Sequence, residues 1–247
     1  MRRIARDLAL CLRVRPHRES SKLVTFFTRS SGRLTGIAKG ARRPKSRLGA
    51  ALEPFALSEV TWYWHEQKTV YTISDAALAR AHPGIPAEPA RFLAAEQFAE
   101  FLLRATREHD ANEALFRLGV VYLGELEAAS GPAIAGLAVS FLLKAASFAG
   151  FRPEVRKCLG CGAAAGCGEG WRFDPGRGGA VCPDCGAGRN APVVPAAWLA
   201  ELSRLLHSPA SELGGLPPDR ELLGLVRAFV ARHVEVPAFH SFNWQEL

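Results

Sequence analysis

The chain has 247 residues, of which 48% are hydrophobic and 22% are charged. This length and balance suit a folded protein of one large or two small domains, and they exclude disorder over most of the chain. The net charge of +7 is uneven, because residues 1–50 carry 14 Lys/Arg against two acids, whereas residues 51–247 carry 17 basic and 22 acidic residues.

Residues 1–80 predict a small β-barrel. Apolar residues alternate over 8–14, and β-branched or aromatic residues predict further strands over 23–28, 34–39, 55–64 and 69–73. The segment Ser30–Arg33 predicts the turn of a hairpin between the second and third of these strands. Five short strands of this kind fit a closed barrel of the OB-fold type, whose open face commonly binds single-stranded nucleic acid.

Residues 81–247 predict a second, helical domain. A linker over residues 81–86 contains two prolines and a glycine, and beyond it the apolar residues fall at helical spacing. The segment 132–150 is apolar nearly all round and is expected to be the central helix. Other helices are predicted around residues 98–105, 115–126, 198–205 and 222–229. The predicted fold class is therefore α+β, an N-terminal OB-fold barrel followed by an α-helical domain.

Two Cys-x-x-Cys pairs predict a metal site within residues 154–192. Cys158 and Cys161 form one pair, and Cys182 and Cys185 form the other, twenty residues later. Four thiolates fill a tetrahedral Zn²⁺ ion and leave no position for a catalytic water, so we expect one structural zinc in a ribbon. Redox-active cysteine pairs are the alternative. Cys167 is a less favourable substitute ligand because it has no partner cysteine at this spacing.

An acid-free basic segment predicts the binding site of a polyanion. No acid occurs between Glu19 and Glu53, and five Lys/Arg fall within residues 39–47. Arginine binds phosphate with two parallel hydrogen bonds, and nearby glycine lets the backbone approach. A solvated face is the alternative, but alternating acids, which would mark one, are missing. The predicted contacts are Lys39, Arg42, Arg43, Lys45 and Arg47, with Lys22 and Arg33 from the strands.

Aromatic residues of the predicted strands offer surfaces for base stacking, although barrel aromatics are more often core. Strand alternation places Tyr63 on the opposite face from Trp62 and Trp64. The other candidates are Phe26, Phe27 and Tyr71.

Enzyme motifs are missing from the sequence. It has no P-loop, no dinucleotide-binding glycine motif and no nucleophile elbow. His17 and Glu19 have the His-x-Glu form of a zinc deaminase, but Val181 stands where that signature needs proline. We therefore expect a protein that is not an enzyme, with a metalloenzyme as a weaker alternative.

Targeting and membrane signals are missing as well. Charged residues (Arg6, Asp7 and Arg13) interrupt any apolar segment near the N-terminus. The longest uncharged apolar stretch, residues 128–143, is shorter than the roughly 20 residues that a spanning helix needs. We therefore expect a cytoplasmic, nucleoid-associated protein without membrane contact.

Two segments resemble the bacterial RecO family of recombination mediators. The residues 10–28, which read LCLRVRPHRESSKLVTFFT, are similar to the family's N-terminal strands. The residues 36–48 (GIAKGARRPKSRL) and 52–55 (LEPF) resemble its most recognisable segment. The order of barrel, helical domain and four-cysteine ribbon is also similar. The C-terminal residues 239–244 match no family end, so a partner contact by the tail is not carried over.

The resemblance implies binding of single- and double-stranded DNA and annealing of complementary strands without ATP. It implies work with RecR, and in some pathways RecF, to help RecA load onto strands coated by single-strand-binding protein. It also assigns DNA contact to the basic residues 39–47 and zinc ligation to the four paired cysteines. The alternative is an RNA-binding barrel-and-ribbon protein without annealing activity.

Overall fold

The computed structural model describes residues 3–165, 168–188, 190–213 and 219–234. Its backbone contacts divide the chain into two compact units, Met1–Ala128 and Ala129–Leu247. Within the described residues, no helix combines the length and the apolar character needed to cross a membrane. Cys167 and the tail 239–244 lie outside the described residues.

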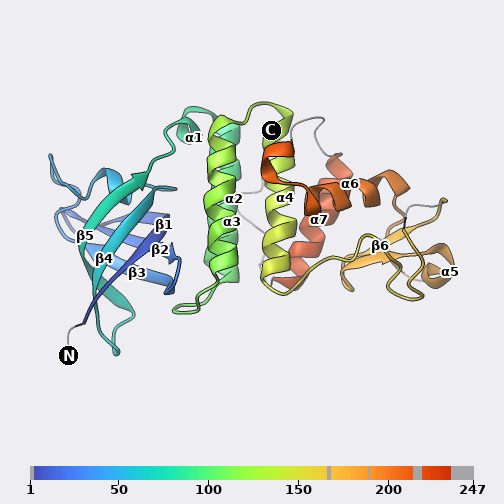
Figure 1. The fold of residues 1–247 in the computed structure, drawn as a ribbon, viewed down its shortest axis with the longest axis horizontal. Helices are drawn as coiled ribbons and strands as arrows, with labels where there is room; N and C mark the ends of the chain where they lie inside the picture. The colour runs from blue at the N-terminus through green and yellow to red at the C-terminus, as the bar shows by residue number, and fades with distance from the viewer. Residues whose placement is uncertain (1–2, 166–167, 189, 214–218, 235–247) are drawn as a thin grey trace. The chain divides into compact units, whose positions relative to one another are not determined.

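The first unit begins with a closed five-stranded barrel in the order β1-β2-β3-β5-β4 (Figure 1). All neighbouring strands are antiparallel except β3 and β5, which pair in parallel. This arrangement confirms the predicted OB-type barrel. The strands are β1 (Arg3–His17), β2 (Ser21–Thr28), β3 (Gly32–Ala38), β4 (Leu57–Trp64) and β5 (Val70–Arg80).

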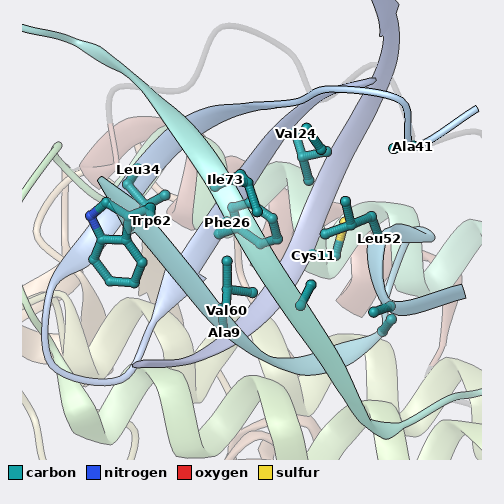
Figure 2. Packing of buried hydrophobic residues seen from close by; sticks show 14 of the residues in the cluster. Ala9, Cys11, Val24, Phe26, Leu34, Ala41, Leu52, Val60, Trp62 and Ile73 are labelled. Carbon is teal, nitrogen blue, oxygen red and sulfur yellow. The ribbon is translucent and has the colours of Figure 1, made fainter. Parts of the chain in front are cut away.

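The barrel core consists of side chains that alternate inward along these strands (Figure 2). Phe26, Val60 and Ile73 from three different strands meet there, each 3% exposed or less. Between β3 and β4, the short helix η1 (Ala50–Leu52) inserts Leu52, which is fully buried in the same cluster. Leu52 therefore anchors the C-terminal end of the loop that precedes η1 to the barrel core.

Strand β5 is longer than the predicted strand, which ends at residue 73. The polar Ser74 and Asp75 interrupt the apolar pattern, yet the pairing with β4 continues to Arg80. The extension follows from β4, whose backbone groups near Leu57 and Ser58 need hydrogen-bonding partners on that side. The predicted linker 81–86 includes the start of a one-turn helix, α1 (Gly84–Ala87).

Two helices complete the first unit, α2 (Pro89–Ala105) and α3 (Glu113–Ala128). The rings of Phe27 in β2 and Phe116 in α3 lie 6.2 Å apart, and Gly119 of α3 approaches Leu10 of β1. The apolar stripes at helical spacing thus lie against neighbouring elements, as amphipathic helices require.

The second unit is built on α4 (Pro132–Phe148), which contacts α6 (Ala196–His207) and α7 (Arg220–His233). The central position predicted for the helix after Pro132 is therefore confirmed within this unit. The stripe of α6 differs slightly, because Leu199 is buried while Trp198 stays half-exposed. The remaining elements are β6 (Arg172–Asp174), β7 (Gly179–Val181), α5 (Pro183–Gly186) and η2 (Ala210–Glu212).

Candidate nucleic-acid interface and metal site

The basic segment forms a loop, residues 39–47, between β3 and η1. Ala41 is buried in the barrel core, and the backbone N–H of Arg42 donates to the Ser20 carbonyl at 2.9 Å. Gly40 turns the chain with a φ of +72°, a conformation that costs glycine little. These contacts fix the start of the loop to the β1–β2 turn.

The middle of the loop is a series of tight turns. The N–H of Ser46 donates to the Arg43 carbonyl at 3.1 Å, and the N–H of Gly49 donates to the Ser46 carbonyl at 3.2 Å. The Ser46 hydroxyl also accepts from the N–H of Leu48 at 3.3 Å. The loop therefore has a defined backbone on which its side chains are displayed.

All five cations of the loop are exposed: Lys39, Arg42, Arg43, Lys45 and Arg47. Arg42 Nη1 lies 3.3 and 3.2 Å from the carbonyl oxygens of Arg18 and Glu19, which holds this side chain across the β1–β2 turn. A groove of about 550 Å³ runs beside the loop and is lined by Lys39 and Arg43. Because no carboxylate lines this groove, its charge is cationic.

One wall of the groove comes from residues that the sequence did not predict as DNA contacts. His17, Arg18 and Ser20 of the β1–β2 turn line it, and Arg18 is exposed. The pairing of β1 with β2 and of β2 with β3 carries residues 17–22 next to residue 38. Only the register of strand pairing could have predicted that these residues line the groove. That register cannot be derived until the hairpin pairing is known.

Lys22 and Arg33 are placed differently from the five loop cations. Lys22 Nζ donates to Glu53 Oε1 at 2.7 Å and to the carbonyls of Gly49 and Leu52 at 3.3 and 3.4 Å, and its side chain is only 12% exposed. Arg33 Nη1 donates to the Leu103 carbonyl at 3.0 Å. Both side chains are occupied with holding the protein together, so the candidate interface consists of the loop and the groove.

The aromatic candidates divide between core and surface. Phe26, Phe27 and Tyr71 are buried, and so is Trp62, which is 1% exposed. Tyr63 and Trp64 are half-buried. The alternation expected along β4 is met, since Trp62 and Trp64 belong to the inner side of the barrel.

The four paired cysteines of the second unit converge on one point. The sulfur atoms of Cys158, Cys161, Cys182 and Cys185 all lie within 4.8 Å of one another, and the Sγ atoms of Cys161 and Cys182 are 3.7 Å apart. A tetrahedron of sulfurs about 2.3 Å from a zinc ion has edges close to this last distance. The donor set therefore fits a tetrahedral metal, and it is complete without His17 or Glu19.

Backbone donors lower the pKa of one of the four thiols, that of Cys158. The N–H groups of Gly160 and Cys182 donate to Cys158 Sγ at 3.3 Å. Burial raises the pKa of the Cys158 thiol, but these backbone donors outweigh burial and bring its pKa down to about 6. Gly160 is needed at its position because a Cβ there would lie 2.8 Å from Cys185 Sγ.

Basic residues that can offset the charge of four thiolates lie around the cluster. Arg156 and Lys157 are exposed beside Cys158 and line a hollow of about 570 Å³ together with Arg152 and His207. Arg172 passes close to Gly186, which follows the second cysteine pair.

A closed OB-type barrel with a cationic loop, joined in one chain to a helical unit with a four-cysteine cluster, defines the class of protein. Comparison with known protein families then identifies the family within this class. The family model described as "Recombination protein O N terminal" matches residues 1–82, and the one described as "Recombination protein O C terminal" matches residues 87–241. The chain therefore belongs to the RecO family.

Relatives named "DNA repair protein RecO" support this placement. The chain is 37% identical to one from Anaeromyxobacter sp. (strain Fw109-5) over 91% of its own length and 89% of the relative's. It is 36% identical to one from Myxococcus xanthus and 33% identical to one from Rubrobacter xylanophilus, in each case over 92% of this chain and 91% of the relative. A RecO family DNA repair protein has its role in recombinational repair.

Proposed function

We propose that this protein binds DNA through loop 39–47 and anneals complementary strands without ATP. The observation that carries the proposal is the display of five exposed cations on a loop whose backbone is fixed to the barrel. Such a surface neutralises the phosphates of two strands at once, lowers their repulsion and raises the frequency of pairing. The mechanism is charge and shape, and it requires no bond chemistry and no catalytic residue.

The proposal extends to the protein's partners. Family membership supports action with RecR, and in some pathways RecF, to help RecA load onto strands coated by single-strand-binding protein. Residues 51–247 carry 17 basic and 22 acidic residues, a balance that suits protein partners better than a second nucleic acid. The barrel would then hold DNA while the helical unit offers docking surfaces.

We propose zinc as the metal of the cysteine cluster. Four thiolates in tetrahedral arrangement are the usual donors of a structural zinc ion, and they leave no open position for a substrate. When bound, the metal would cross-link two segments of a glycine-rich region. Metal analysis of the purified protein should find one zinc per chain, and clearly less than one would contradict the assignment.

The salt dependence of DNA affinity tests the electrostatic mechanism. If the loop neutralises about five phosphates, the affinity for single-stranded DNA should fall roughly a hundredfold between about 50 and 200 mM salt. Fluorescence anisotropy of a labelled oligonucleotide measures this directly. An affinity that stays flat over this range would refute the mechanism.

A competition between RNA and DNA of one sequence tests the alternative function. Exposed cations on a barrel of this type also suit RNA, and this is the observation that keeps an RNA-binding protein as a second candidate. The mediator proposal predicts DNA binding accompanied by annealing. A strong preference for RNA without DNA annealing would favour the alternative.

A further inference from the structure

The barrel has a second hollow at the end of β1 that lies away from loop 39–47. We call this hollow the barrel mouth; its volume is about 380 Å³, and Arg3, Ala5, Ser31, Trp62 and Trp64 line it. Arg3 begins β1, whereas His17 of the groove ends it, so the two hollows are separated by the length of that strand. Figure 2 shows Trp62, which lines the mouth, and Ala41 of loop 39–47 at opposite sides of the barrel core.

Trp62 forms a buried wall of the mouth. Its side chain is 1% exposed, and its indole nitrogen Nε1 has no hydrogen-bond partner. Figure 2 shows this nitrogen on the side of the indole that faces away from the rest of the labelled cluster. Because this nitrogen has under 1 Å² of accessible surface, Trp62 contributes an apolar wall to the mouth and no hydrogen bond.

Trp64 supplies an aromatic surface that its neighbours hold in place. Its ring stacks on Tyr71 with centroids 5.0 Å apart and an interplanar angle of 12°, and His109 packs edge-on against it at 4.8 Å. The Tyr71 hydroxyl and His109 Nε2 are 2.9 Å apart, which ties these two supporting rings together. The indole of Trp64 is thus fixed beside the mouth instead of being free to collapse into it.

The turn that closes the mouth is also rigid. Asp7 Oδ2 accepts from the backbone N–H and the hydroxyl of Ser30 at 2.7 and 2.8 Å. The Thr28 hydroxyl donates to the Gly32 carbonyl at 2.9 Å and lies 3.0 Å from the N–H of Ser31. Ser31 therefore stands at a fixed position on the rim, which lowers the ordering cost of binding.

The charges at the mouth favour an anionic ligand. Arg3 is exposed, and nothing in the described part of the chain binds its guanidinium. Arg6 is exposed too and pairs with Glu59, which is a weak contact at the surface. Aromatic rings and arginine together form the chemistry that recognises a nucleotide.

We propose that the barrel mouth binds one unpaired base of single-stranded DNA, with Trp64 stacking on the base and Arg3 contacting the adjoining phosphate. This site rests on the proposed DNA-binding function and adds a second contact to it. A DNA strand that loop 39–47 binds at one end of the barrel is then also bound, through one of its bases, at the other end.

The experiment uses an eight-nucleotide thymidylate that carries one 5-iodouracil. Ultraviolet cross-linking followed by peptide mass spectrometry should place the cross-link on Trp62 or Trp64. Trp64→Leu should weaken binding of the octamer about 5- to 160-fold, which corresponds to about 1–3 kcal/mol of base stacking. Tyr63→Leu, on the opposite face of the same strand, is the matched control and should bind as the native protein does. Arg3→Gln should weaken binding without changing the melting temperature.

The outcomes separate the two proposals. Octamer binding with cross-links confined to loop 39–47 and the β1–β2 turn, and unchanged affinity in Trp64→Leu and Arg3→Gln, would overturn the mouth site and leave the loop proposal intact. Failure of the native protein to bind single-stranded DNA of any length would overturn both. Cross-links at β4 together with loss of affinity in Arg3→Gln would support the mouth site.

Discussion

The seven basic residues that the sequence predicts as DNA contacts have different surroundings in the structure. Lys22 and Arg33 donate to carbonyls from partly buried positions, whereas the five loop cations are exposed, including Arg42, which also donates to two carbonyls. Charge and the absence of acids predicted the region correctly as a cationic surface, because those properties belong to the sequence itself. Which cation is buried depends on the chain that folds over it, and residues 49–53 fold over Lys22.

Lys22→Met tests this division at the level of a single residue. Losing the ammonium leaves two backbone carbonyls and Glu53 without their donor, so the free energy of unfolding should fall by about 1.5–3 kcal/mol. Arg47→Gln is the matched control: it should leave stability within about 0.5 kcal/mol and weaken DNA binding. Urea denaturation measures the first effect. A Lys22→Met variant as stable as the native protein would contradict the structural role.

At the scale of elements, most strands and helices could be predicted because their apolar residues keep one period. The end of β5 and the helix α1 could not be predicted, since both depend on neighbours instead of on their own pattern. The cysteine turns were predictable as a pair, because a two-residue spacer sets the geometry of both sulfurs. Their convergence on one point needed the β6–β7 hairpin, which brings Cys182 back toward Cys158.

Cys158→Ser should lower the melting temperature and abolish stoichiometric metal binding. Metal binding and local folding are coupled, so losing one thiolate loosens the glycine-rich segment as a whole. Cys11→Ala is the control of the same residue type: Cys11 lies in the barrel core, outside the cluster, and the variant should keep its metal. Thermal melts measure the stability of both variants, and metal analysis measures their metal content. An unchanged melting temperature in Cys158→Ser would argue against the coupling.

The segment between β5 and α1 carries a pH dependence. His82 is 6% exposed beside Glu127, with Nδ1 at 3.5 Å from Oε2. Burial, followed by the charge of Arg80, lowers the pKa of His82, although Glu127 opposes both. The unfolded state therefore takes up a proton at a higher pH than the folded state does.

The stability contributed by neutral His82 is thus present above its ordinary pKa of about 6.5 and is lost as the pH falls toward the lower folded value. The free energy of unfolding should decrease below pH ~6.5 by at most about 1.4 kcal/mol per pH unit from this group. His82→Asn should flatten that decrease in urea titrations at several pH values. Identical slopes for the variant and the native protein would rule out His82 as the source.

At the scale of the whole molecule, the distribution of charge along the sequence agrees with the proposal that the barrel binds DNA and the helical unit binds protein partners. The basic residues 1–50 include β1, β2, β3 and loop 39–47, and the remaining residues have a net negative charge. Composition alone could predict that a polyanion binds the N-terminal part. It could not predict a second hollow at the barrel mouth, because Trp62 and Arg3 are brought together only by strand pairing.

The most direct test of the central claim is annealing of two labelled complementary DNA strands without ATP. The native protein is compared with a variant in which Lys39, Arg42, Arg43, Lys45 and Arg47 are all changed to Gln. All five side chains are exposed, so the variant should fold and melt as the native protein does. We expect the native protein to anneal the strands and the folded variant to lose that activity. Annealing that survives in the variant would contradict the assignment to loop 39–47, and no annealing by the native protein would contradict the proposed function itself.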